Sequence, residues 1–166
     1  YYDKSIKKEN PFLFVGRAND ANKRFSLIRE TLLKIKDGEK KLIVCGEENP
    51  GFGNYLGYVS NKKLNELYNS TKYILLPSKY EGIGLPMIEA MICGSLPITC
   101  SDNETAKEFL PPDFMCEPNA DSIVKHIEKL DKSYKIKQEL AFKLGEKYKE
   151  QFNKIRIAEN ILSIIK

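Results

Sequence analysis

Residues 78–97 read SKYEGIGLPMIEAMICGSLP, and this stretch decides how the rest of the chain is interpreted. Glu81 and Glu89 stand on either side of a glycine-containing loop that runs directly into a predicted helix. Pro86 suits the first position of that helix, because the N–H that proline lacks would be unpaired there. Leu85 has no side-chain acceptor with which to cap the helix, whereas Ser, Thr, Asp and Asn do. The pattern therefore predicts a helix that starts without a side-chain cap.

The backbone N–H groups at this helix start are predicted to be open to a ligand. The first-turn donors and the amides of Gly82, Ile83 and Gly84 have no evident partner within the chain. Amides at a helix N-terminus, next to glycines that allow close approach, form an anion site that suits phosphate. Glu89 lies one turn further on, where its carboxylate would accept hydrogen bonds from hydroxyl groups. Phosphate donors beside a hydroxyl acceptor indicate a sugar nucleotide.

The same segment resembles the Glu-x7-Glu signature of retaining GT-B glycosyltransferases, the class that includes glycogen synthases and bacterial phosphatidylinositol mannosyltransferases. The usual form of the signature is Pro-Ser-x-x-Glu-Gly-Phe-Gly-Leu-Pro-x-x-Glu-Ala-Met-Ala-x-Gly-x-Pro. This chain departs from it at Ile83, which replaces the aromatic residue, and at Ile92 and Cys93. A buried strand–turn–helix with incidental carboxylates is the alternative, and the length of the ordered match disfavours it.

The resemblance assigns roles to residues outside the signature as well. Phe14-Val15-Gly16-Arg17 resembles the turn whose arginine contacts the donor diphosphate. Lys23 resembles the lysine that follows this arginine, although the spacing in the family is usually about one residue shorter than in this chain. Gly57-Tyr58-Val59 resembles the stretch whose backbone meets the nucleobase. Within the signature, Glu89 resembles the carboxylate that binds the ribose, and Glu81 resembles the one beside the donor sugar.

These assignments give a predicted site in two groups. The catalytic group is Arg17, Lys23 and Glu81. The donor-binding group is Gly16, Tyr58, Val59, Gly82, Ile83, Gly84, Leu85 and Glu89. Positive charge from Arg17 and Lys23, together with the helix start at Pro86, would offset the charge of a nucleoside diphosphate leaving group. No metal site and no cofactor are expected besides a donor such as a UDP- or GDP-sugar, because the sequence has no Asp-x-Asp pair.

Short apolar runs alternate with helical patterns along the chain, which is typical of βαβ units and a parallel sheet. Strands are predicted at residues 12–15, 42–45, 54–57, 73–77 and 96–99 and near residue 114. Helices are predicted at residues 25–35 and 60–68, from Pro86 onward, at residues 105–110 and 122–130, and beyond, with Gly145 as a weak point between the last two. The fold class is α/β: a Rossmann-like doubly wound parallel sheet of about six strands flanked by helices. By resemblance, this is the C-terminal half of a GT-B fold.

One connection breaks the alternation. Only the segment from Gly46 to Gly53 separates the second and third predicted strands, and a parallel crossover normally needs about a dozen residues or more. The resembled family usually has a helix there. We therefore expect a bare loop and a trimmed edge of the sheet.

The length of 166 residues suits one domain with a sizeable core. Residues 1–11 are predicted to be a linker from a missing N-terminal domain, and residues 12–166 to be the nucleotide-sugar-binding domain, including the C-terminal helices. The chain opens on Tyr1 rather than Met, so a fragment of a longer protein is expected. The isolated domain is expected to be inactive, because GT-B active sites lie between two halves.

The net charge of +4 comes mainly from lysines, many of them near the C-terminus: Lys132, Lys135, Lys137, Lys143, Lys147, Lys149, Lys154 and Lys166. A solvated helix face is the favoured interpretation, and weak peripheral attraction to an anionic membrane is the other. Nucleic acid is not an expected partner, because no basic stripe is interleaved with aromatic residues. The absence of C-x-x-C spacing and of a signal-peptide pattern predicts a cytoplasmic protein with reduced cysteines.

Two other functions are compatible with the fold. One is a nucleotide-sugar-binding module without transfer activity, against which the intact set of Arg17, Lys23, Glu81 and Glu89 argues. The other is a different GT-B reaction, such as phosphorolysis or epimerisation. A phosphorylase would need a lysine environment for its cofactor, which the sequence does not show. The preferred prediction is the donor-binding half of a retaining, metal-independent glycosyltransferase.

Overall fold

The computed structural model describes residues 3, 5–82 and 84–152. Its centre is a six-stranded sheet with the strand order β3-β2-β1-β4-β5-β6. Every neighbouring pair of strands is parallel. The strands are β1 (Asn10–Val15), β2 (Leu42–Cys45), β3 (Asn54–Gly57), β4 (Thr71–Leu76), β5 (Leu96–Cys100) and β6 (Met115–Cys116). The predicted α/β class and the parallel six-stranded sheet are therefore confirmed.

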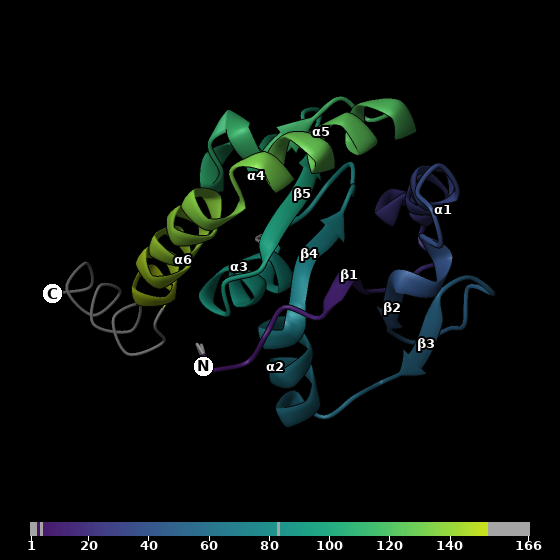
Figure 1. Ribbon diagram of the computed structural model, residues 1–166, viewed down its shortest axis with the longest axis horizontal. Coiled ribbons are helices and arrows are strands. Elements are labelled where there is room, and N and C mark those ends of the chain that lie inside the picture. The colour runs from purple at the N-terminus through teal and green to yellow at the C-terminus, as the bar shows by residue number, and fades with distance from the viewer. Residues whose placement is uncertain (1–2, 4, 83, 153–166) are drawn as a thin grey trace, which may run out of the picture.

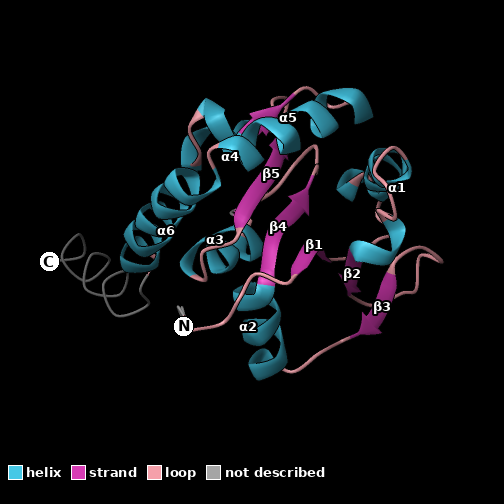
Figure 2. Cartoon of the chain, in the orientation of Figure 1, coloured by secondary structure: helices cyan, strands magenta, loops and turns pink. Residues whose placement is uncertain are grey.

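Among the described residues, six α-helices cover this sheet, and short 3-10 turns lie between some of the elements. The helices are α1 (Phe25–Leu33), α2 (Asn61–Ser70), α3 (Leu85–Ile92), α4 (Glu104–Phe109), α5 (Ala120–Lys132) and α6 (Tyr134–Gln151). Helices α1 and α5 pack together on one side of the sheet, while α2, α3 and α6 lie on the other side (Figure 1). Figure 2 shows the same layers, with the strands in magenta between the cyan helices. The sheet is doubly wound, as predicted.

The central strands are apolar on both faces because helices cover both faces. Leu13 and Phe14 of β1, Ile74 of β4 and Leu96 of β5 are completely buried. Strand β3 at the edge alternates between exposed and half-buried residues instead. Strand β1 begins at Asn10, two residues before its predicted start and inside the segment predicted to be a linker. Differences of this size at the end of an element are usual.

The connection between β2 and β3 is a bare loop, as predicted. Residues 46–53 form bends and turns without a helix. Phe52 of this loop is buried, with 3% of its surface exposed, and the Arg29 guanidinium of α1 lies 5.5 Å from the centre of its ring. One aromatic side chain thus covers apolar surface at a place where a crossover helix would otherwise pack.

Gly145 was predicted to lie between the last two helices, and this is wrong. Helix α5 ends at Lys132 and α6 begins at Tyr134, so Ser133 separates them and Gly145 lies inside α6. A Cβ atom on Gly145 would be 2.6 Å from the backbone nitrogen of Ile92 in α3. The glycine is therefore present because α3 and α6 approach each other closely there, and not because the helix breaks.

The topology identifies where a ligand would bind. Strands β1 and β4 are neighbours, but the chain leaves β1 towards β2 on one side and leaves β4 towards β5 on the other. Parallel α/β sheets bind ligands in the crevice outside the carboxyl ends of the strands at such a switch point. The loops that follow Val15 and Leu76 therefore form the expected site. Within the described part of the chain, none of the helices is long and apolar enough to span a bilayer.

Candidate functional site

The loops after β1 and β4 meet in an ion pair. Lys23 ends a short 3-10 helix after β1, and its Nζ atom lies 2.7 Å from Oε1 of Glu81 in the loop after β4. The two side chains are only 19% and 20% exposed. The carboxylate of Asp20 caps the turn that carries Lys23 by accepting a hydrogen bond from the backbone N–H of Asn22. Two of the predicted catalytic residues thus stand in direct contact at the switch point.

The loop that carries Glu81 is also held from the β5 side. The amide of Asn103 donates to the carbonyl oxygen of Ser78 at 2.9 Å, and the hydroxyl of Thr105 donates to the carbonyl oxygen of Glu81 at 2.6 Å. Asn103 is buried and caps α4 as well, through the backbone N–H of Ala106. The backbone on either side of the Glu81 carboxylate is therefore fixed by hydrogen bonds to the neighbouring loop.

A second ion pair lies beside the first. The guanidinium of Arg24 makes two hydrogen bonds to Asp102 in the loop after β5, at 2.8 and 2.5 Å. These bonds raise the pKa of Arg24 and lower the pKa of the Asp102 carboxyl group. Two parallel bonds of this kind give a defined geometry as well as energy. The sequence analysis missed this pair, because nothing in the local pattern around either residue distinguishes it from surface charges.

Helix α3 starts without a side-chain cap, as predicted, but one residue earlier. Leu85 is already helical, so Pro86 is not at the first position. Gly84 is the N-cap residue with φ of +70°, a conformation that favours glycine, and within the described residues no side chain caps the helix. Gly82 and Leu85 are exposed beside it, and the predicted site residue Ile83 lies outside the described residues. The helix start is thus open to solvent, as a phosphate site requires.

Three residues of the predicted donor-binding group and the predicted catalytic residue Arg17 come together at the ends of β1, β2 and β3. Gly16, Arg17, Tyr58 and Val59 all line one cavity of about 170 Å³. The side chain of Arg17 is 68% exposed and forms an ion pair with Asp20 at 2.9 Å. Backbone from two separate loops therefore faces the same hollow, with one solvent-accessible guanidinium at its rim.

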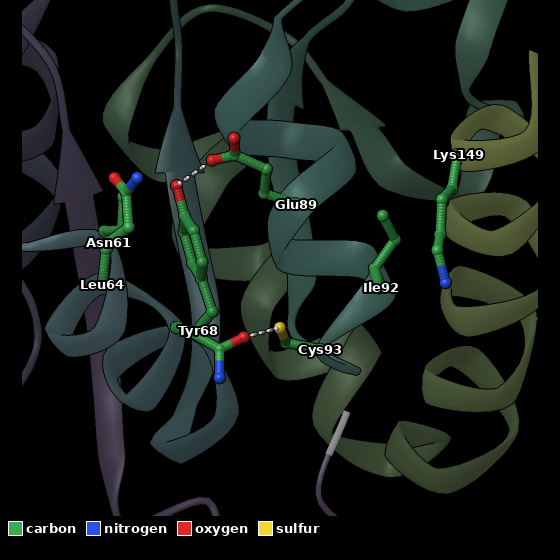
Figure 3. A pocket seen from close by; sticks show the side chains of 8 residues that line it. Asn61, Leu64, Tyr68, Glu89, Ile92, Cys93 and Lys149 are labelled. Atoms are coloured by element: carbon green, nitrogen blue, oxygen red, sulfur yellow. Dashed lines mark hydrogen bonds between the residues drawn. The ribbon is translucent and has the colours of Figure 1, made fainter. Parts of the chain in front are cut away.

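Glu89 lines a different and larger cavity of about 490 Å³ between α2, α3 and α6 (Figure 3). The hydroxyl of Tyr68 in α2 donates a hydrogen bond of 3.0 Å to the Glu89 carboxylate. Burial, with a further effect from Glu89, raises the pKa of Tyr68, so this hydroxyl stays protonated and can donate. Leu64 lines both this cavity and the one beside Arg17, so the two cavities lie on either side of one side chain. The sequence analysis did not identify Tyr68.

Among the described residues, the His, Cys, Asp and Glu side chains bear on two further kinds of site, a metal centre and a reactive thiol. Among the residues that the structure describes, no group of three or more His, Cys, Asp or Glu side chains could hold a metal ion. All four cysteines are free, and three of them are buried. Burial raises the pKa of the Cys45 and Cys100 thiols to about 11, which makes both unreactive as thiolates at neutral pH.

Sequence comparison gives a family and curated relatives. The family model described as "Glycosyl transferases group 1" matches residues 53–151. The O-antigen chain mannosyltransferase B of Escherichia coli is 40% identical over 79 residues, which cover 46% of this chain and 20% of that protein. The chain therefore matches only a fifth of this relative's length.

Comparison with solved structures identifies the same fold. Sucrose-phosphate synthase from Thermosynechococcus elongatus has a TM-score of 0.78 at 19% identity, and the match covers 97% of this chain and 46% of that one. The Anabaena HepE protein, solved with UDP and glucose, has a TM-score of 0.77 at 14% identity, covering 95% and 48%. The Rossmann-like fold is that of the C-terminal half of GT-B enzymes, and this chain belongs to the glycosyl transferases group 1 family.

Proposed function

We propose that this chain is the donor-binding half of a retaining glycosyltransferase that works without a bound metal ion. The observation that carries the proposal is the Lys23–Glu81 ion pair at the topological switch point, next to the uncapped start of α3. A cation and free helix amides suit the diphosphate of a donor. A carboxylate beside them suits the sugar, on which positive charge develops as the diphosphate leaves.

We assign the following residues to successive parts of the donor. Arg17, Lys23 and the first amides of α3 bind the diphosphate, and Glu81 contacts the transferring sugar. Glu89 accepts hydrogen bonds from the ribose hydroxyl groups, and the backbone at Tyr58 and Val59 meets the base. In the reaction, the bond from the anomeric carbon to the diphosphate oxygen breaks and a bond to an acceptor hydroxyl oxygen forms. The proton of that hydroxyl group leaves with the diphosphate.

The relatives support this choice of donor class. HepE was solved with UDP and glucose, and the bacterial relative is named as a mannosyltransferase. A nucleoside diphosphate sugar as the donor agrees with both. The acceptor would be bound by a second domain that precedes this one, so transfer by the described domain alone should be very slow. The cytoplasmic location and the weak membrane attraction of the C-terminal lysines stay predictions.

The test is a turnover assay on the full-length protein. UDP-glucose, GDP-mannose and ADP-glucose are supplied in turn, with and without EDTA, and release of the nucleoside diphosphate is measured. We expect one donor to be consumed at a rate that EDTA changes by less than about twofold, because Arg17, Lys23 and the helix start supply the positive charge. Complete loss with EDTA, restored by Mg²⁺ or Mn²⁺, would contradict the metal-free mechanism.

The same assay separates an enzyme from a binding module. Tight binding of a donor by the full-length protein with no turnover on any acceptor would favour a module without transfer activity. The anomeric configuration of the product, read by proton NMR immediately after transfer, tests retention. An inverted product would contradict that part of the proposal.

A further inference from the structure

Asn22 joins the loop that carries Lys23 to the loop that carries Glu81. Its side-chain Oδ1 accepts a hydrogen bond from the backbone N–H of Tyr80 at 2.8 Å, and its Nδ2 donates to the carbonyl oxygen of Tyr80 at 2.7 Å. The backbone carbonyl of Asn22 accepts a third bond, from the N–H of Lys79 at 2.9 Å. The Asn22 amide therefore pairs with Tyr80 as a neighbouring strand would.

The position of Asn22 itself does not depend on these side-chain bonds. Its backbone N–H donates to the carboxylate of Asp20, and the next N–H, that of Lys23, donates to the Asp20 carbonyl oxygen at 2.8 Å. Arg24 is fixed by its two bonds to Asp102. The loop after β1 is thus held in place by its own contacts. The Asn22 side chain instead fixes the backbone of Tyr80, the residue directly before Glu81.

We propose that Asn22 is a positioning residue for the transfer reaction, which sets the Glu81 carboxylate against the Lys23 ammonium before the donor arrives. The inference rests on the function proposed above for this site. The amide accepts from the N–H of Tyr80 through Oδ1 and donates to its carbonyl oxygen through Nδ2, so one side chain pairs with both backbone groups of that residue. Aspartate can accept but not donate, and alanine can do neither.

The first experiment compares Asn22→Ala and Asn22→Asp with a matched control in the full-length protein. The control is Asn10→Ala, because the Asn10 amide also joins two elements, through a bond of 2.9 Å to the hydroxyl of Ser70. Using the donor that is consumed among UDP-glucose, GDP-mannose and ADP-glucose, we expect kcat to fall about 10- to 100-fold in both Asn22 variants. The affinity for the corresponding nucleoside diphosphate should change less than about threefold, since Lys23 keeps its place.

The second experiment tests whether Asn22 acts through Glu81. In a Glu81→Gln background, Asn22→Ala should lower kcat by less than about threefold, because residues that act as one unit are not additive. The inference is overturned if Asn22→Ala costs the same factor in both backgrounds, leaves kcat unchanged, or weakens diphosphate binding alone. An equal loss of kcat in Asn10→Ala would overturn it as well. Unfolding midpoints of the single variants show whether a loss reflects folding.

A third measurement separates this inference from the proposed function. Amide hydrogen exchange at Tyr80 should be slow in the unmodified protein and in Asn22→Asp, which keeps the acceptor, and at least about tenfold faster in Asn22→Ala. Equal exchange in all three proteins would overturn the positioning role even if the enzyme is active. If the unmodified protein neither binds nor consumes any donor, the proposed function fails, whatever the exchange at Tyr80 shows.

Discussion

Glu81 and Glu89 belong to one short segment, but their surroundings differ. Glu81 is paired with Lys23, and hydrogen bonds fix the backbone around it. Glu89 accepts one hydrogen bond from Tyr68 and faces the large cavity beside α6. A carboxylate that binds the ribose stabilises the bound donor and the transition state equally. A carboxylate that contacts the transferring sugar stabilises mainly the transition state, because charge develops on the sugar during the reaction.

The two glutamates should therefore give different kinetics. Glu89→Ala should mainly raise the donor KM, because loss of a charged hydrogen bond costs about 1.5–3 kcal/mol of binding. Glu81→Ala should mainly lower kcat and leave nucleoside diphosphate affinity nearly unchanged, because that ligand has no sugar. Steady-state kinetics with titration calorimetry of UDP, GDP and ADP will check both. Loss of diphosphate binding in Glu81→Ala, with none in Glu89→Ala, would reverse the assignment.

Tyr68 should affect the donor site through Glu89. Tyr68→Phe keeps the ring and removes only the hydroxyl that orients the Glu89 carboxylate, so we expect the donor KM to rise by a factor that corresponds to about 0.5–1.5 kcal/mol. The control is Tyr73→Phe, because the Tyr73 hydroxyl also donates to a carboxylate, that of Asp131, at 2.6 Å. The same rise in KM in both variants, or none in Tyr68→Phe, would contradict the role of Tyr68.

At the scale of elements, the sequence predicted those strand and helix limits that depend on neighbouring residues in the chain. The strand at residues 42–45 was predicted with its observed limits, because an apolar run bounded by polar residues and glycine is a strong local signal. The helix predicted at residues 60–68 forms as α2, and the Ser60 side chain caps it by accepting from the N–H of Lys63. The predicted start of α3 at Pro86 was one residue late, because the helix already includes the exposed Leu85, which no pattern in the sequence marks as helical.

Contacts between distant parts of the chain could not be predicted in this way. Asn22 and Tyr80 are 58 residues apart, and Tyr68 and Glu89 are 21 residues apart. No periodicity or motif within one element indicates which distant residue a side chain will bond to. Gly145 is a further example. Its local effect is to lower helix propensity, which suggests a break, but the glycine is needed because the backbone of α3 approaches it closely. The proposed site residues were predicted by resemblance, and the residues that hold them in place were not predicted.

Gly145→Ala tests the close packing of α3 against α6. The added Cβ would meet the backbone of Met91 at 2.8 Å as well as that of Ile92, so one helix must shift. We expect a loss of about 1–3 kcal/mol in the free energy of unfolding, although alanine favours a helix by about 1 kcal/mol. Chemical denaturation will measure it, with exposed Lys143→Ala in the same helix as the control. A stabilised Gly145→Ala protein would contradict the packing argument.

For the whole molecule, Lys8 joins the segment before β1 to the helices beneath the site. Its ammonium donates to the carbonyl oxygens of Tyr68 and Cys93 at 2.9 and 2.7 Å, and to the hydroxyl of Ser95 at 3.2 Å. Those carbonyls stand in the last turn of α2 and at the end of α3, where a helix favours a cation. The residues that lead into the sheet are thus tied to the two helices that carry Tyr68 and Glu89.

This contact predicts a dependence of stability on pH. Burial lowers the pKa of Lys8 to about 8, so above that pH the folded protein has lost a proton that the unfolded chain keeps until about pH 10.5. The unfolded state then binds more protons, and Lys8 makes stability rise with pH. Between pH 7.5 and 9, the free energy of unfolding should increase by about 1 kcal/mol relative to Lys8→Met.

The measurement is limited to pH values below 9, because other buried groups titrate above that pH. Above pH 9 the buried Cys45 and Cys100, with pKa values raised to about 11, have the opposite effect, because their unfolded forms release protons first. Lys7→Met at an exposed position serves as the control and should track the unmodified protein. A difference between the unmodified protein and Lys8→Met that stays flat or falls as pH rises would contradict the burial of a charged Lys8.

The central claim is that the carboxyl ends of the strands, around Lys23 and Glu81, bind a nucleoside diphosphate. The most direct measurement is a titration of the ¹⁵N-labelled protein with UDP, GDP and ADP, followed by backbone amide shifts. We predict saturable shifts for one diphosphate at residues 16–23, 57–59 and 78–89, and their loss in Lys23→Ala. Shifts confined to the opposite end of the sheet, or no shifts with any of the three, would contradict the claim.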